Sequence, residues 1–117
     1  MYLSMHDFAV YNRRRCEGAD GFHHQLKSWS LSDWITAIVG ELGEAANVAK
    51  KLNRVRDGIP GNVQTEAELR GMLRREIADT FIYLDLLAQS QGFDLGEAVR
   101  DTFNAKSDEI GSAVKIP

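Results

Sequence analysis

The sequence has few of the features that cross-link small proteins or direct them to membranes. Among its 117 residues there is one cysteine, Cys16, so no intrachain disulfide can form. We therefore expect the protein to reside in a reducing cytoplasm. No apolar run approaches the roughly 20 residues that a bilayer-spanning helix needs. The first residues, MYLSMHDFAVYNRRR, lack the charged-then-apolar order of a signal peptide. We therefore expect a cytoplasmic protein with no membrane partner.

Positive charge is also scarce. Lys and Arg together number 14 against 17 Asp and Glu, which gives a formal net charge of −3. The one arginine run, residues 13–15, is too short to form the basic face that nucleic-acid-binding domains present. We therefore expect no nucleic-acid partner, and the absence of a basic recognition helix disfavours a DNA-binding helix-turn-helix.

Strand patterns and chain-breaking residues are rare as well. No alternation of apolar and polar residues indicates a β-strand, and Pro60 is the one proline inside the chain. Capping patterns such as Ser-x-x-Asp and Thr-x-x-Glu, together with glycine-rich breaks, mark the helix limits instead. They predict helices at about residues 5–15, 31–55, 66–90 and 95–110. The fold class is therefore all-α, a four-helix-type bundle in a single domain of residues 1–117.

Apolar residues indicate how these helices pack. The run TFIYLDLLA, residues 80–88, contains one charge, Asp85, and is apolar on nearly every side. A helix that is apolar all round lies at the centre of an assembly, so we expect a homodimer or a dimer of dimers formed through this helix. On the preceding helix, residues spaced three and four apart predict one buried stripe: Trp34, Ile38, Leu42, Ala45, Ala49 and Leu52.

Four acidic residues form two short pairs, Glu41 with Glu44 and Glu76 with Asp79. The spacing of three places the members of each pair about 5–6 Å apart between Cβ atoms on a helix. Both pairs border apolar stripes, where burying an unpaired carboxylate costs several kcal/mol. If the two long helices pack antiparallel, the four carboxylates can converge, and a cation would then relieve their repulsion. Ligation by oxygen alone favours Mg²⁺, with Mn²⁺ as a substitute, over zinc.

A solvated surface is the competing interpretation of these acids. Such pairs are common on exposed helix faces, and one pair alone would indicate nothing more. Two pairs on the two longest helices leave a metal site and a plain surface both open. A di-iron carboxylate bundle is disfavoured because neither pair includes the histidine of its Glu-x-x-His motif.

The sequence around the acids resembles a known family. ELGE followed by EIAD, with KKLNRVRDGIPGN, IYLDLLAQSQGFDLGEAV and FNAKSDEIG, is similar to MazG-like members of the all-α nucleoside triphosphate pyrophosphohydrolase superfamily. The likeness covers about residues 28–117, and the long connection between the pairs departs from the family's pattern. It implies that Glu41, Glu44, Glu76 and Asp79 hold Mg²⁺ on a triphosphate. It also implies hydrolysis of NTPs or dNTPs between the α and β phosphates, as nucleotide-pool sanitation.

A polyanionic substrate needs positive partners from the protein. Lys51 lies seven residues after Glu44 and therefore on the same helix face. Lys106 lies on the apolar stripe of the last helix, where it either reaches solvent or reaches into the site. The resemblance of FNAKS favours the site for Lys106, and it alone implies a substrate contact for Asn104.

The nucleobase partners are expected just before the first long helix. Residues from this region recognise the base in related pyrophosphatases, so the resemblance points to His24 and Trp29. A tryptophan face can stack on a base, although core packing remains the alternative reading of Trp29. Trp34 lies on the apolar stripe, which favours core packing. Zinc is not expected at His23 or His24 because no cysteine or spaced histidine accompanies them.

The leading hypothesis is therefore an enzyme that hydrolyses nucleoside triphosphates. The alternative is a non-catalytic helical interaction module that keeps the fold and has lost the catalytic activity. Two intact acid pairs favour the enzyme, because a decayed site would usually have lost a member.

Overall fold

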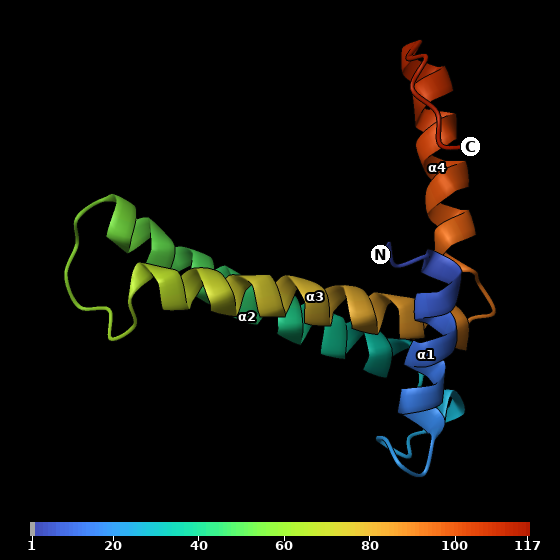
Figure 1. Ribbon diagram of the computed structural model, residues 1–117, viewed down its shortest axis with the longest axis horizontal. Coiled ribbons are helices and arrows are strands. Elements are labelled where there is room, and N and C mark those ends of the chain that lie inside the picture. Colours follow the sequence, from blue (N-terminus) through green and yellow to red (C-terminus); the bar gives the residue numbers. More distant parts are fainter. Residues whose placement is uncertain (1) are drawn as a thin grey trace. The chain divides into compact units, whose positions relative to one another are not determined.

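The computed structural model describes residues 2–117, and over this range the chain is helical, without strands (Figure 1). It contains α1 (Met5–Glu17), a 3-10 helix (Leu26–Ser28), α2 (Leu31–Arg56), α3 (Glu66–Ser90) and α4 (Leu95–Ile110). The predicted all-α class is confirmed. α3 and α4 begin and end where the sequence predicts, and α1 and α2 run slightly further. None of these helices is long and apolar enough to cross a membrane.

Reciprocal caps explain where the long helices begin. Ser30 Oγ accepts a hydrogen bond from the Asp33 backbone N–H at 3.2 Å, and the Asp33 carboxylate accepts from the Ser30 N–H at 2.9 Å. Thr65 and Glu68 form the same pair at the start of α3, with distances of 3.1 and 3.2 Å. Each cap satisfies backbone donors that the first turn of a helix leaves unpaired.

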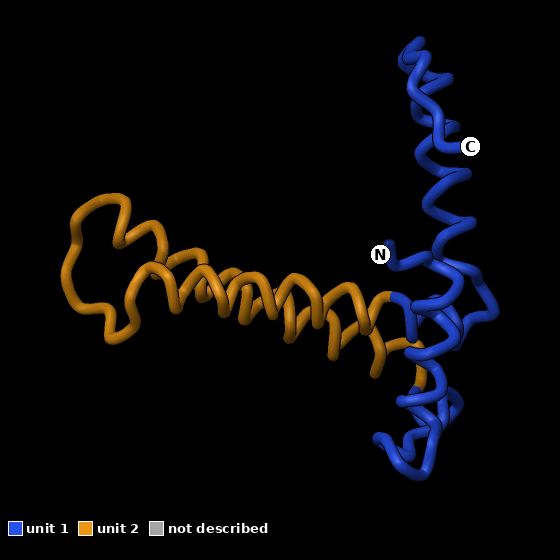
Figure 2. Tube along the Cα trace, in the orientation of Figure 1, with its two compact units in different colours: residues 1–29, 85–117 blue, residues 30–84 orange. Residues whose placement is uncertain are grey.

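The chain forms two compact units (Figure 2). The hairpin unit contains residues 30–84, and the terminal unit contains the described residues up to Trp29 together with residues 85–117. α3 begins in the hairpin unit and ends in the terminal unit. A single domain over residues 1–117 stays a prediction.

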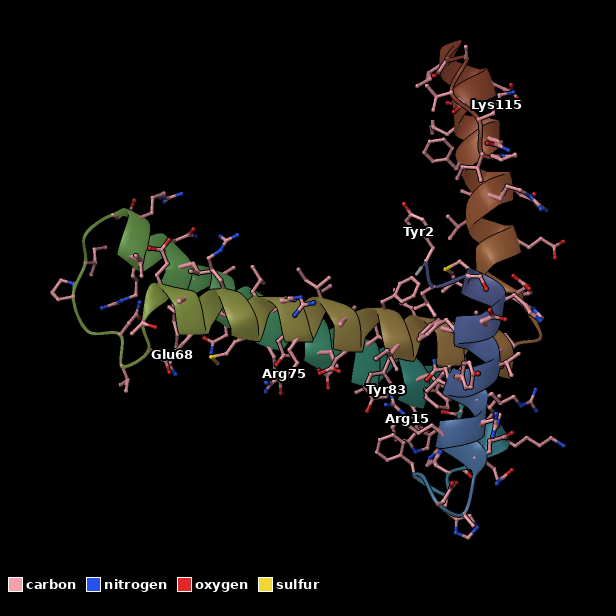
Figure 3. The ribbon with its side chains drawn as sticks, viewed as in Figure 1. Tyr2, Arg15, Glu68, Arg75, Tyr83 and Lys115 are labelled. Atoms are coloured by element: carbon pink, nitrogen blue, oxygen red, sulfur yellow. The ribbon has the colours of Figure 1, made fainter. Side chains whose placement is uncertain are left out.

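In the hairpin unit, α2 and α3 run antiparallel, as predicted. The Trp34 ring near the start of α2 lies 6.4 Å from the ring of Tyr83, late in α3 (Tyr83 is labelled in Figure 3). Further along α2, Glu44 lies beside Glu76, which comes earlier in α3. Increasing residue numbers on one helix therefore match decreasing numbers on the other.

The core of the hairpin unit is narrow. Trp34, Ala45, Val48 and Leu69 are buried, with Leu69 completely covered. The predicted stripe is right for Trp34 and Ala45 and wrong for Leu42, whose side chain is 58% exposed. The reason is geometric, since one neighbouring helix covers only a thin strip of α2, and Val48 lies on that strip.

The terminal unit is joined by a buried polar network. Asp85 of α3 is 1% exposed, and its Oδ2 accepts hydrogen bonds from Asn12 of α1 at 2.9 Å and from Gln89 at 2.8 Å. The Gln89 amide also donates to the backbone oxygen of Ala9 at 2.9 Å. Amide donors therefore compensate a carboxylate that has been removed from water, and they tie α1 to α3.

Beyond α4 the chain folds back along the helix (Figure 1). Gly111 ends α4 with a φ of 72°, a left-handed conformation that glycine adopts without steric cost. Residues 112–117, here called the trailing segment, then run beside α4 and pair with Asn104. α4 and the trailing segment thus form one local substructure of the terminal unit.

Candidate metal centre

Three of the four predicted acids come together on the hairpin unit. Glu41 and Glu44 lie one turn apart on α2, and Glu76 faces them from α3. Each of the three offers a carboxylate oxygen within 4.8 Å of the other two. The convergence follows from the spacing of three residues and from the antiparallel packing, which sets Glu44 opposite Glu76.

The close approach of like charges changes the titration of these groups. The pKa of Glu44 is raised, chiefly by the negative charge of Glu76, and further by hydrogen bonding to Glu76 and by the charge of Asp79. The pKa of Glu76 is raised mainly by burial and then by hydrogen bonding to Glu41. Asp79 therefore acts as a neighbouring charge, although its oxygens lie outside the 4.8 Å group.

One oxygen of this cluster lacks a donor. Glu76 as a residue is only partly buried, but its Oε2 exposes less than 1 Å² and receives no hydrogen bond from the described residues. A covered carboxylate oxygen usually has a partner. A hard divalent cation would provide one here, because carboxylate oxygens are the ligands that Mg²⁺ and Mn²⁺ prefer. The donor set therefore fits the predicted metal, and it contains none of the nitrogen or sulfur ligands typical of zinc.

The predicted phosphate-binding residues lie in both units. Lys51 belongs to α2 of the hairpin unit, and its backbone oxygen accepts from the Asn62 side chain at 2.8 Å. Lys106 belongs to α4 of the terminal unit, where its ammonium pairs with Glu109 at 3.0 Å in an exposed position. The amide of Asn104 is engaged by the trailing segment. Lys106 and Asn104 thus have partners within their own unit.

The aromatic residues around the start of α2 fall into two groups. His24 and Trp29 contact each other edge to face in the terminal unit, with ring centroids 4.7 Å apart, and both are partly buried. Trp34 is 1% exposed, so the favoured reading of Trp34 as a core residue is confirmed. The structure thus places the two predicted base-binding residues, His24 and Trp29, side by side.

The terminal unit also contains an open cleft of about 1050 Å³ between α1 and the chain leading into α4. Arg13, Arg14 and Arg15 line it, and the guanidinium of Arg15 (labelled in Figure 3) lies 5.5 Å from the centre of the Phe22 ring. The described lining includes none of the predicted substrate residues. It does include Asp85.

In the sequence, Asp85 was noted only as the one charge in an apolar run. That position was the one sequence signal that Asp85 would be buried with hydrogen-bond partners.

Comparisons with known protein families, with curated proteins and with solved structures found no match for this chain. The likeness to MazG-like proteins therefore depends on the sequence motifs quoted above. The chemistry of the site depends on the geometry of the hairpin unit.

Proposed function

We propose that this chain is a Mg²⁺-dependent nucleoside triphosphate pyrophosphohydrolase with the helical bundle of the all-α NTP pyrophosphatases. It would cleave NTPs or dNTPs between the α and β phosphates, releasing a nucleoside monophosphate and pyrophosphate, in nucleotide-pool sanitation. The observation that carries the proposal is the convergence of Glu41, Glu44 and Glu76 from two antiparallel helices. The orphaned Oε2 of Glu76 adds to it, because that oxygen needs a cation or a donor.

The same carboxylates would hold the metal. Glu41, Glu44 and Glu76 supply oxygen ligands, and Asp79 adds a fourth negative charge beside them. When bound, Mg²⁺ or Mn²⁺ neutralises phosphate oxygens and lowers the pKa of a coordinated water. The acids of α2 and α3 therefore set both the position and the charge of the centre.

The protein's own groups then carry out the hydrolysis. Either Glu41 or Glu44 orients a water molecule and accepts its proton as the water oxygen attacks the α phosphorus. The bond from the α phosphorus to the oxygen that bridges to the β phosphate breaks in line with the attack. The bridging oxygen keeps the electron pair of that bond and leaves as part of pyrophosphate. One triphosphate and one water therefore give a monophosphate and pyrophosphate.

Substrate contacts complete the proposal. Lys51, which lies on α2 with two of the acids, would neutralise phosphate charge. A phosphate contact by Lys106 and a substrate hydrogen bond from Asn104 stay predictions. The present ion pair of Lys106 with Glu109 is solvent-exposed, and such pairs contribute little, so the ammonium is readily released. A nucleobase contact for His24 and Trp29 stays a prediction.

Product analysis tests this proposal. The full chain is incubated with a panel of NTPs and dNTPs plus Mg²⁺, and pyrophosphate is measured separately from orthophosphate. We expect pyrophosphate, and we expect Glu41→Ala to abolish it while the helical circular dichroism signal is retained. Orthophosphate with a nucleoside diphosphate would refute the assignment of the cleaved bond.

The hairpin unit also supports self-association. Large apolar side chains are exposed on both of its helices, which is unusual over an extended surface of a monomer. They are Leu31, Ile35, Val39 and Leu42 on α2, and Ile77 and Leu84 on α3. We propose that a second copy covers this surface, giving a homodimer or a dimer of dimers. Sedimentation should show one of these species, and a monomer would contradict the proposal.

The same apolar surface favours one second candidate function, a non-catalytic helical interaction module. That module would use the hairpin for assembly and would not turn over nucleotides. Absence of turnover across the whole panel, with an intact oligomer, would favour it over the enzyme.

A further inference from the structure

Charge is divided sharply along the hairpin unit. The acidic half, residues 30–45 and 76–84, contains five acidic residues and no Lys or Arg. The basic half, residues 46–75, contains seven Lys and Arg against three Asp and Glu. Because α2 and α3 run antiparallel and Glu44 lies beside Glu76, the boundary falls at the same level on both helices. The basic half therefore begins directly beside the acids of the candidate centre and extends to the turn.

The cations of the basic half have few acidic partners within the protein. Arg56 forms an ion pair with its neighbour Asp57 at 2.8 Å. The Arg54 guanidinium donates to the backbone oxygen of Pro60 in the turn. Within residues 2–117, none of the remaining cations of this half forms an ion pair, and these are Lys50, Lys51, Arg70, Arg74 and Arg75. Half of the Lys and Arg of an acidic chain is therefore gathered in one segment and left mostly without neutralisation.

This division of charge has a consequence for an anionic substrate. The acids repel a nucleotide over the acidic half, whereas the excess of positive charge attracts it over the basic half. Arg75 (labelled in Figure 3) directly precedes Glu76 on α3. Lys51 follows Glu44 by seven residues, which is about 10 Å along the helix axis. A triphosphate chain that starts at the acids and points toward the turn therefore comes within reach of both cationic side chains.

We propose that the basic half is a polyphosphate-binding surface, which draws the β and γ phosphates toward the turn and leaves the nucleoside over the acidic half. The role in turnover rests on the proposed function, whereas the attraction of a phosphate chain follows from the charge division itself. The surface selects by charge, so it binds a triphosphate more tightly than a monophosphate of the same nucleoside. It attracts the substrate and the transition state alike, so it lowers KM and leaves kcat unchanged.

A triple substitution tests this surface while Lys51 and Arg75 stay in place. Lys50→Gln, Arg70→Gln and Arg74→Gln together remove three exposed cations from the basic half. Glutamine has nearly the helix propensity of lysine and arginine, so the helices should be retained. At low ionic strength we expect KM for a nucleoside triphosphate to rise roughly tenfold, with kcat unchanged. The rise should shrink as salt is added, because salt screens exposed charges.

The matched control changes the net charge equally at another place. Arg14→Gln, Lys27→Gln and Lys115→Gln remove three exposed cations from the terminal unit. We expect KM of this control to rise by less than about twofold under the same conditions. Equal rises in the two variants would overturn the proposal, since net charge alone would then account for both. An unchanged KM in the variant of the basic half would overturn it as well.

Inorganic triphosphate separates this inference from the proposed function. At low ionic strength with a chelator, it should shift the backbone amide resonances of residues 46–75 more than those of residues 30–45. Its dissociation constant should rise roughly tenfold in the variant of the basic half. Such binding without turnover of any nucleotide would remove the proposed function and keep the surface. Turnover without binding of inorganic triphosphate to residues 46–75 would remove the surface and keep the proposed function.

Discussion

Two carboxylates of α3 occupy contrasting surroundings. Asp85, in the terminal unit, is 1% exposed and accepts hydrogen bonds from the amides of Asn12 and Gln89. Glu76, in the hairpin unit, is less buried as a residue, yet one of its oxygens is covered without a donor and its neighbours are also acids. Depth of burial therefore does not distinguish a structural acid from a candidate ligand. The groups that face each carboxylate make that distinction.

Removing the Glu76 charge should have the largest effect. Glu76→Gln keeps the shape of the side chain but loses a ligand charge, so we expect pyrophosphate release to fall by roughly 100-fold or more. The loss is measured under saturating nucleotide at fixed Mg²⁺. Asp85→Asn is the matched control on the same helix, and its turnover should remain within a few-fold of the original. Equal losses in the two variants would remove the distinction between the acids.

Removing the Asp85 carboxylate should instead lower stability. Asp85→Ala leaves a gap and deprives two amide donors of their acceptor, so we expect the free energy of unfolding to fall by about 2–3 kcal/mol. Urea denaturation measures the change. Asp85→Asn keeps an acceptor oxygen and should lose less. A metal-free Glu76→Ala protein should show no comparable destabilisation, because Glu76 lies among repelling charges.

The cap of α3 at Thr65 tests whether stability alone accounts for the effects at Glu76. Thr65→Ala removes the side-chain acceptor that caps α3 and should lower the free energy of unfolding by about 1 kcal/mol. We expect the Mg²⁺ concentration that gives half-maximal turnover to stay unchanged. A parallel loss of metal affinity would indicate that the effects of Glu76 substitutions arise from stability alone.

Much of the fold could be predicted because local sequence determines helix ends. The side chains of Ser30 and Thr65 each reach a backbone N–H three residues ahead, so their effect needs no tertiary information. The approach of Glu44 to Glu76 was also predictable, from the spacing of each pair and from antiparallel packing of the two long helices. These features depend on residues close in sequence or on a single packing assumption.

The remaining features depend on contacts between distant segments. Asn12 and Asp85 are 73 residues apart, and no pattern along the chain identifies one as the donor for the other. The pairing of Asn104 with Ile116 joins a helix to an irregular segment and also lacks a periodic signal. The exposure of Leu42 could not be predicted either, because a stripe does not show how many neighbouring helices cover it.

The smallest expected effect is on the pH dependence of stability in the metal-free protein. The pKa values of Glu44 and Glu76 are raised above their ordinary value of 4.5, so the folded state binds more protons than the unfolded state above that pH. Their contribution to stability is therefore lost as pH rises from about 4.5 through the raised pKa values. The opposite trend belongs to Glu17, whose pKa is lowered by hydrogen bonding to Arg13.

Urea midpoints at low ionic strength with a chelator measure this dependence. The difference between the original chain and Glu44→Gln isolates the cluster, and that difference should favour the variant increasingly as pH rises. Added Mg²⁺ should reverse the sign at neutral pH, since the cation compensates the charges that the variant lacks. A constant difference across pH would show that these carboxyls titrate as isolated groups.

The turn that joins α2 to α3 determines where the chain can change in length. It is tethered to α2 by hydrogen bonds from the Ile59 N–H to Arg54 and from Asn62 to Lys51, while Val63 is 94% exposed. One residue inserted beside Val63 would bulge into solvent and leave the helical register intact. The same insertion after Glu44 would rotate the preceding part of α2 by about 100° relative to the rest and scatter the acids. Insertions should therefore be tolerated in the turn between α2 and α3 and should not be tolerated within the two helices.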